Sequence, residues 1–191
     1  MSFNTTVFAR DDLAVVADQN GNLRVVRTED QHATALVVVL PVAPSGRFLL
    51  TKQLRVGYAG EVLGWGLLSV RRCVGAPPDA AAGDAVGKAL GISRDAFSLT
   101  RLAMLSLDDT TLLFPATFYA AELRQEKAGP SVRAFTNSEI CSLAATAGCV
   151  DAGLTLCATS LYAERRRAER RKQLWSAAVG LHEEKIGDEA G

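Results

Sequence analysis

Cysteine and histidine have the most versatile chemistry of the residues in this chain, because they can bind zinc and act as nucleophiles or bases. The four cysteines form no C-x-x-C pair, and the two histidines lie far from them in the sequence. Zinc sites need closely spaced ligands, and a nucleophilic cysteine needs an activating base. We therefore expect no metal, cofactor or catalytic site here, only reduced thiols. The six residues are Cys73, Cys141, Cys149, Cys157, His32 and His182.

A basic segment near the C-terminus has the composition to bind an acidic partner. Residues 164–172 (ERRRAERRK) hold six basic and two acidic side chains. Nucleic-acid surfaces usually interleave aromatic with basic residues, and this segment has no aromatic residue. We interpret this segment as the solvated side of a long helix, supported by Glu-to-Arg pairs, or as a contact surface for another protein. Binding of nucleic acid is the less favoured interpretation.

An apolar group follows the basic segment directly. Leu174, Trp175, Ala178, Val179 and Leu181 lie beyond the part of the chain that a compact domain would bury. Such a group on an extension often marks a partner site. The alternative is that the helix folds back on its own domain. The candidate partner-binding residues are Arg165, Arg166, Arg170, Arg171, Lys172, Leu174 and Trp175.

The elements that must position these residues begin with three short segments rich in β-branched residues. Residues 5–10, 13–17 and 23–27 predict strands, and Asn20-Gly21 between the last two favours a hairpin. We predict a small antiparallel appendage over residues 1–30.

The strands of the main domain follow. Residues 33–42 (ATALVVVLPV) are almost continuously apolar, which is typical of a central strand. After a turn at residues 43–46, residues 47–53 predict the return strand. Further segments are predicted as follows: strands at 98–106 and 112–121 around a turn at 107–110, irregular glycine-rich chain at 57–66, and a polar loop at 125–130.

Three helices complete the domain. Residues 79–90 follow two prolines and end at Gly91, the usual limits of a helix, although two interior glycines weaken it. Asn137 or Ser138 is expected to cap a second helix ending near Gly148. Asp151 is expected to cap a third, which runs to about residue 179. One side of the third helix holds Leu154, Cys157, Ala158, Leu161 and Tyr162. The order of these elements indicates a mixed α/β (α+β) core.

Within this frame, residues 65–92 (WGLLSVRRCVGAPPDAAAGDAVGKALGI) resemble the Nudix box of the ADP-ribose pyrophosphatase branch of Nudix hydrolases, without gaps. The matching positions are Trp65, Gly75, Ala81, Ala82 and Gly91. The N-terminal strands resemble the small β-domain of the family, and its other parts are resembled by residues 53–55 (QLR), 118–123 (FYAAEL) and 148–161 (GCVDAGLTLCATSL). The resemblance therefore covers about residues 5–165. It implies a Nudix-like α/β/α sandwich with a mixed sheet, a small N-terminal antiparallel β appendage and a long C-terminal helix.

The resemblance also implies where catalytic acids should lie. The family hydrolyses diphosphates with Mg²⁺ or Mn²⁺, held by carboxylates that share one side of a helix. The corresponding residues here are Ala85, Lys88 and Ala89, so two carboxylates are replaced by methyl groups and one by an ammonium group. The ammonium group of a lysine repels the cation that a carboxylate at the same position would bind.

The remaining positions of the box depart from the family pattern in the same way. The expected glutamates beside the tryptophan and after Gly75 are Gly66 and Ala76, the opening glycine is Val70, and the expected arginine is Asp84. A shifted register does not help, because the helix has only Asp79 and Asp84 as acids. We interpret these two as helix N-terminal charges, with Asp84 and Lys88 forming an i,i+4 pair. We expect the hydrolytic chemistry to be lost.

Bulk properties fit an ordinary globular protein. Of 191 residues, 48% are hydrophobic and 22% charged, and with a net charge of zero no overall field favours nucleic acid or membrane. No apolar run is long enough to span a bilayer. The N-terminus lacks a secretory segment and is a poor transit peptide. We expect an intracellular, reducing compartment, with mitochondrion and cytoplasm both open.

Three hypotheses for function follow. In the first, residues 31–165 form an inactive Nudix-like domain and residues 166–191 a basic, amphipathic helical extension. The chain then serves as a structural subunit that binds other protein subunits through this extension and the N-terminal appendage; a homodimer built with the appendage is an alternative. In the second, it hydrolyses ADP-ribose or another nucleoside diphosphate derivative with non-standard acids such as Glu61 and Glu126. In the third, it binds nucleotide or RNA without hydrolysis.

Overall fold

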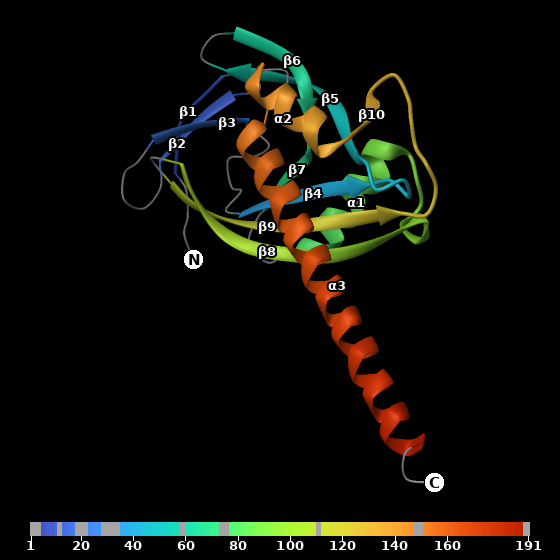
Figure 1. Cartoon of the computed structure of the whole chain (residues 1–191). Helices are drawn as coiled ribbons and strands as arrows, with labels where there is room; N and C mark the ends of the chain where they lie inside the picture. Colours follow the sequence, from blue (N-terminus) through green and yellow to red (C-terminus); the bar gives the residue numbers. More distant parts are fainter. Residues whose placement is uncertain are drawn as a thin grey trace.

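The computed structural model describes most of the 191 residues (Figure 1). The expected hairpin turn around Asn20-Gly21 lies outside the described residues, as do residues 73–76 and residues 147–150. Positions that the sequence analysis singled out, among them His32, Cys73, Gly75, Ala76 and Cys149, therefore receive no structural account. The described ranges are 5–10, 13–17, 23–27, 35–57, 60–72, 77–109, 112–146 and 151–188.

The first three strands form a sheet of their own. β1 (Thr5–Arg10), β2 (Leu13–Ala17) and β3 (Leu23–Arg27) pair in the order β1-β2-β3, and both pairings are antiparallel. The three strands have the bounds that the sequence predicts, since short β-branched segments separated by turn residues favour this arrangement.

The centre of the main sheet is β4 (Ala35–Val42), in which every residue except Leu36 is buried. It pairs in parallel with β9 (Leu112–Leu123) and antiparallel with β7 (Leu68–Arg72). Successive side chains of a strand point to opposite faces. Val37 and Val39 therefore lie in one hydrophobic core cluster, and Val38 and Leu40 in the other.

Around β4 the main sheet has seven strands and is mixed. The path of pairings is β10-β5-β4-β9-β8, while β6 pairs with β5 and β7 with β4. Only the pairing of β4 with β9 is parallel. The remaining strands are β5 (Phe48–Gly57), β6 (Gly60–Gly66), β8 (Phe97–Asp109) and β10 (Val132–Phe135).

Helices cover both faces of this sheet (Figure 1). α1 (Pro78–Leu90) packs on the face that holds Val37 and Val39. α2 (Asn137–Ala145) and the first half of α3 (Ala152–Asp188) pack on the opposite face. A short 3-10 helix, η2 (Arg94–Ala96), leads into β8. The expected fold class, an α/β/α sandwich with a mixed sheet and a long C-terminal helix, is confirmed.

The prediction of irregular chain at residues 57–66 is wrong. β6 pairs along its whole length with β5, from Gly57↔Gly60 to Thr51↔Gly66. Glycine disfavours strands, but ladder hydrogen bonds come from the backbone and need no side chain. Gly64 and Gly66 are buried, and the Gly66 carbonyl accepts a hydrogen bond from Thr51 Oγ1 at 3.3 Å.

Other expected bounds also need correction. Residues 107–109 continue β8 instead of forming a turn, because they remain paired with β9. α2 is capped by Thr136 and not by Asn137 or Ser138, and α2 ends at Ala145. α3 continues to Asp188, beyond the expected residue 179. β7 and β10 have no counterpart in the sequence-based prediction.

α1 ends as its sequence predicts. Pro78 occupies its first turn, and Gly91 takes a left-handed conformation (φ 62°) that glycine adopts without strain. The amides of Gly91 and Ile92 both donate to the Gly87 carbonyl. Gly83 lies against Arg94: a Cβ there would come within 3.0 Å of Arg94 Nε. This interior glycine therefore makes room for a side chain packed over the helix.

Phe118 provides a test of the two-sided core. It is 0% exposed in β9, so Phe118→Ala should lower the free energy of unfolding by about 3–5 kcal/mol. Met104, on neighbouring β8, is 62% exposed, and Met104→Ala should cost about 0.5 kcal/mol or less. Urea denaturation of both variants measures the difference. Equal losses of stability would contradict the described packing.

Candidate functional site

α1 has an inner and an outer side. Ala82, Val86 and Leu90 are buried against the sheet together with Gly83. Lys88 and Ala89 are exposed on the outer side, and Ala85 is partly buried. The three positions at which the family resemblance expects metal-binding carboxylates thus carry two methyl groups and an ammonium group.

The two acids of α1 do not supply a substitute set of ligands. Asp79 accepts a hydrogen bond from the hydroxyl of Tyr119, which is buried in β9. Asp84 is exposed, and within the described residues it does not form the expected ion pair with Lys88. Solvation of two exposed charges outweighs so weak a pair. Among the residues that the structure describes, no three His, Cys, Asp or Glu side chains are grouped to hold a metal ion.

Glu126, one of the non-standard acids considered for hydrolysis, has a structural contact. Its Oε1 accepts a hydrogen bond of 2.9 Å from the backbone amide of Ser45. Hydrogen bonds from the side chain of Ser45 and from this backbone amide lower the pKa of Glu126, and Arg47 lowers it further. The carboxylate therefore stays ionised while it ties the β4–β5 turn to the loop after β9. The other acid, Glu61, lies in β6, and its side chain is outside the described part of the chain.

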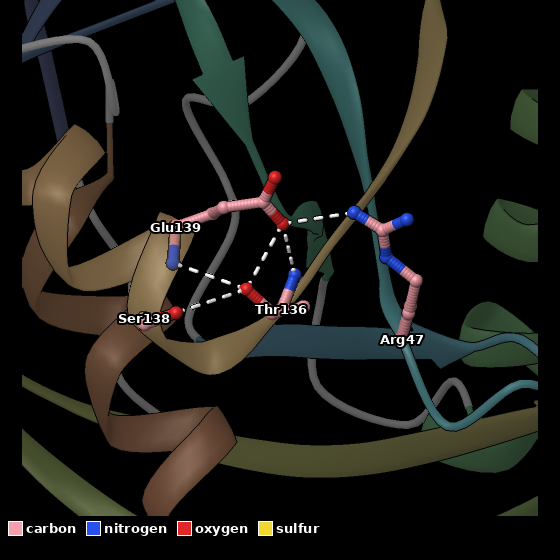
Figure 2. A network of polar contacts seen from close by, with 4 residues as sticks. All are labelled: Arg47, Thr136, Ser138 and Glu139. Atoms are coloured by element: carbon pink, nitrogen blue, oxygen red, sulfur yellow. Dashed lines mark hydrogen bonds and ion pairs between the residues drawn. The ribbon is translucent and has the colours of Figure 1, made fainter.

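A polar network fixes the start of α2 (Figure 2). Thr136 Oγ1 accepts a hydrogen bond from the Glu139 amide, while Glu139 Oε2 accepts one of 2.6 Å from the Thr136 amide. This reciprocal pair is a capping box. Arg47, just before β5, donates to the same Oε2 atom at 2.9 Å. The network thus joins the start of α2 to the residue that precedes β5 of the main sheet.

These contacts strongly favour the ionised form of Glu139. Hydrogen bonds from the Thr136 amide and hydroxyl, followed by the bond from Arg47, lower its pKa from 4.5 to about 2. A carboxylate that accepts several hydrogen bonds is stabilised as the anion. The network is therefore stable at neutral pH and is weakened only by acid.

The first half of α3 is bound to the sheet as expected. Leu154, Cys157, Leu161 and Tyr162 pack against the core cluster on the α2 side, and Ala158 is fully buried in it. The predicted apolar side of this helix is confirmed. Burial raises the pKa of the Cys157 thiol, so this cysteine stays protonated and is a poor nucleophile.

Polar contacts between α3 and the sheet gather around Glu122 of β9. Tyr162 donates a hydrogen bond of 2.8 Å to Glu122 Oε1, and Arg166 Nη1 lies 3.9 Å from the same atom. The ring of Tyr162 also meets Phe48 edge to face, with 5.9 Å between centroids. Burial and the bond to Glu122 raise the pKa of Tyr162 to about 12.

Beyond Arg166 the helix projects away from the domain (Figure 1). Leu174 is 71% exposed and Trp175 is 74% exposed. The alternative that this segment folds back onto its own domain is therefore wrong for these two residues. We call residues 167–188 the free half of α3. Twenty-two residues of helix extend about 33 Å at 1.5 Å per residue.

Some of the basic residues are paired within the helix and some are not. Arg165 lies 2.9 Å and Arg166 3.3 Å from Glu169, and Arg167 lies 2.5 Å from Glu164. These are the expected Glu-to-Arg pairs. Within the described residues, the next three basic residues have no such ion pair. They are Arg170, Arg171 and Lys172.

Sequence reasoning missed the residues that hold α2 and α3 in place. Thr136 and Glu139 have the T-x-x-E spacing of a capping box, so a search for that pattern would have found them. Glu122 and Tyr162 are 40 residues apart, and no local pattern pairs them. The structure brings the predicted partner-binding residues together on one helix, away from the outer side of α1.

No family model matches the chain, and no curated protein matches it in sequence. Among solved structures, the chain is similar to one described as the crystal structure of an ADP compounds hydrolase, at 17% identity and a TM-score of 0.44. That match covers 85% of this chain and 96% of the other. The fold class rests on the chain's own sheet and helices.

The helices that the structure describes differ from bilayer-spanning helices in length or hydropathy. None of them, including the long α3, is sufficiently long and apolar to serve as a membrane span.

The capping network predicts a pH-dependent contribution to stability. Because the pKa of Glu139 is lower in the folded state, its contribution is complete above pH 4.5 and is lost as the pH falls to about 2. Glu139→Gln should therefore destabilise the protein at pH 7, and the difference from wild type should shrink over this interval. Denaturation at a series of pH values measures it.

Glu164→Gln, in the exposed part of α3, is the matched control and should change stability little at any pH. A Glu139→Gln effect that is the same at pH 2 and pH 7 would contradict the assigned role of this carboxylate.

Proposed function

We propose that this chain is a catalytically inactive Nudix-fold protein that serves as a structural, partner-binding subunit of a larger protein assembly. The observation that carries this proposal is the outer side of α1. Where the family resemblance expects three carboxylates, the helix presents Ala85, Lys88 and Ala89. The inner side of the same helix retains a well-packed apolar surface.

Replacement of the three expected carboxylates of α1 would strongly disfavour binding of a divalent metal ion. Mg²⁺ and Mn²⁺ bind through oxygen ligands, and neither a methyl nor an ammonium group can donate an electron pair to them. An exposed ammonium group about 4 Å from a divalent ion would add roughly 2 kcal/mol of repulsion in water, twice the value for unit charges. Hydrolysis of a diphosphate needs that ion to activate water and to neutralise developing charge.

The free half of α3 supports the second part of the proposal. Its Leu174 and Trp175 are exposed, and within the described residues Arg170, Arg171 and Lys172 have no ion pair. A surface of this kind is typical of protein contacts. The N-terminal three-stranded sheet offers a further contact surface, and a homodimer formed through it is the alternative arrangement. Analogy with accessory subunits that reuse enzyme folds suggests a mitochondrial assembly, while the cytoplasm stays equally open.

Hydrolysis with non-standard acids is the second candidate function. Glu126 remains ionised, as a metal ligand must. Its Oε1 is already used to fix the Ser45 amide, which disfavours a role in catalysis. Binding of nucleotide or RNA without hydrolysis is the third candidate. Calorimetry with ADP-ribose tests it, since an absence of heat at millimolar ligand would remove it.

The loss of chemistry predicts no turnover of diphosphates. Incubation with ADP-ribose and either Mg²⁺ or Mn²⁺ should release no AMP above that of heat-treated protein, as measured by chromatography. AMP release would contradict the proposal. If that release disappeared in Glu126→Gln but not in Asp84→Asn, the second candidate function would be correct.

The role as a subunit predicts a larger native mass. Chain isolated from its source cells without denaturation should migrate in size-exclusion chromatography with other proteins, well above its own 20.3 kDa. Recombinant chain alone provides the size control. Migration of the native chain as a free monomer or a homodimer would refute the proposal.

A further inference from the structure

The most deeply buried residues of α3 lie on a different side of the helix from the middle of the exposed apolar pair near its end. In the first half, Thr155, Ala158 and Thr159 are buried against the sheet. In the free half, Leu174 and Trp175 are exposed. At about 100° per residue, the middle of the Leu174–Trp175 pair lies roughly 160° around the axis from the middle of the buried set.

The exposure of Leu174 and Trp175 and their distance along the helix exclude the chain's own main sheet as their cover. Leu174 is directed away from the sheet that binds the first half, whereas Trp175 shares a side with Cys157 but lies about 27 Å further along the helix. Arg166 contacts Glu122 of β9, and both exposed residues lie about two turns beyond that contact. Another molecule must therefore cover them if they are covered at all.

Arginines border the apolar pair. Arg170 is four residues before Leu174, and Arg171 is four residues before Trp175, so each lies on the same side of the helix as the residue it precedes. Arg167 precedes Arg171 by the same interval. Arg170 and Arg171 have no ion pair within the described residues. We call these five residues the docking face; it has an apolar centre and a cationic border.

We propose that the docking face binds as a helix in an apolar groove of a partner protein whose rim carries Asp or Glu side chains. This inference rests on the proposed function and names the kind of partner. Trp and Arg contribute most to the binding energy of protein interfaces, and guanidinium groups pair with carboxylates through two parallel hydrogen bonds. An amphipathic helix in a groove is a common mode of recognition.

Charge disfavours a second copy of this chain as the occupant. Parallel pairing of two docking faces sets Arg170 and Arg171 against the same residues of the other copy. Antiparallel pairing centred on residues 174–175 sets these arginines opposite residues 178–179, which are alanine and valine. Neither arrangement provides an acid for the guanidinium groups, so their charge would be left unpaired at the interface.

Nucleic acid is also disfavoured. Glu164 and Glu169 already neutralise the arginines at 165–167, and their carboxylates would repel phosphate groups nearby. Trp175 is the only aromatic residue of the docking face, which is too few for the stacked arrays that single strands use. Leu174 gains nothing from a phosphate backbone but gains free energy in an apolar groove.

Site-specific crosslinking tests this proposal. In the full-length chain, expressed in its source cells, a photoreactive amino acid replaces Trp175. The control carries the same amino acid in place of Gln173, because residue 173 is exposed on the opposite side of the helix. We expect position 175 to crosslink to one protein, at an apolar groove bordered by Asp or Glu in peptide mapping. Arg170→Glu with Arg171→Glu should reduce the yield about tenfold. Substitution of the mapped Asp or Glu residues of the partner by Lys should restore the crosslinking yield of the charge-reversed chain.

Several outcomes would overturn the proposal. They are crosslinks to RNA, to lipid or to a second copy of the chain, equal yields from positions 173 and 175, no crosslink, or a yield unchanged by the double charge reversal. Circular dichroism of the charge-reversed chain confirms that it is folded. If the wild-type chain migrates in an assembly but crosslinking fails, only the docking face is wrong. If the wild-type chain migrates alone, the proposed function fails as well.

Discussion

Burial of β4 on both faces is the constraint on which the rest of the structure depends. Val37, Val38, Val39 and Leu40 are 0% exposed, and their side chains alternate between the two faces of the sheet. Full burial of such a side chain contributes about 1.5–3 kcal/mol, so neither face can be left in water. α1 must therefore cover one face, and α2 with the first half of α3 must cover the other.

The requirement to cover the sheet constrains the residues on only one side of each helix. Val86 and Leu90 of α1 are fixed by contact with the sheet, while Lys88 and Ala89 on the outer side are not. The outer side can exchange carboxylates for other groups without loss of the fold. The same reasoning applies along α3, where the need to cover the sheet ends at Tyr162 and Arg166. The residues beyond are free to serve another surface.

The sequence alone predicted those helices and strands that strong local patterns determine. The apolar segment around β4, the β-branched N-terminal strands, and the proline and Gly91 limits of α1 were all found in this way. The strand β6 was missed because its glycines disfavour a strand that only pairing with β5 stabilises. The contact of Glu122 with Tyr162 was missed because it depends on tertiary structure. The exposure of Trp175 could be suspected from the sequence but was decided only by the direction of α3.

The central claim is that α1 has kept its packing and lost its metal site, and binding of Mn²⁺ to the full-length chain tests this most directly. Electron paramagnetic resonance distinguishes free from bound Mn²⁺ during a titration. The account predicts that the wild-type chain leaves the ion free, whereas Ala85→Glu with Lys88→Glu and Ala89→Glu gains binding. Tight binding by the wild-type chain, lost in Asp79→Asn or Glu126→Gln, would contradict it.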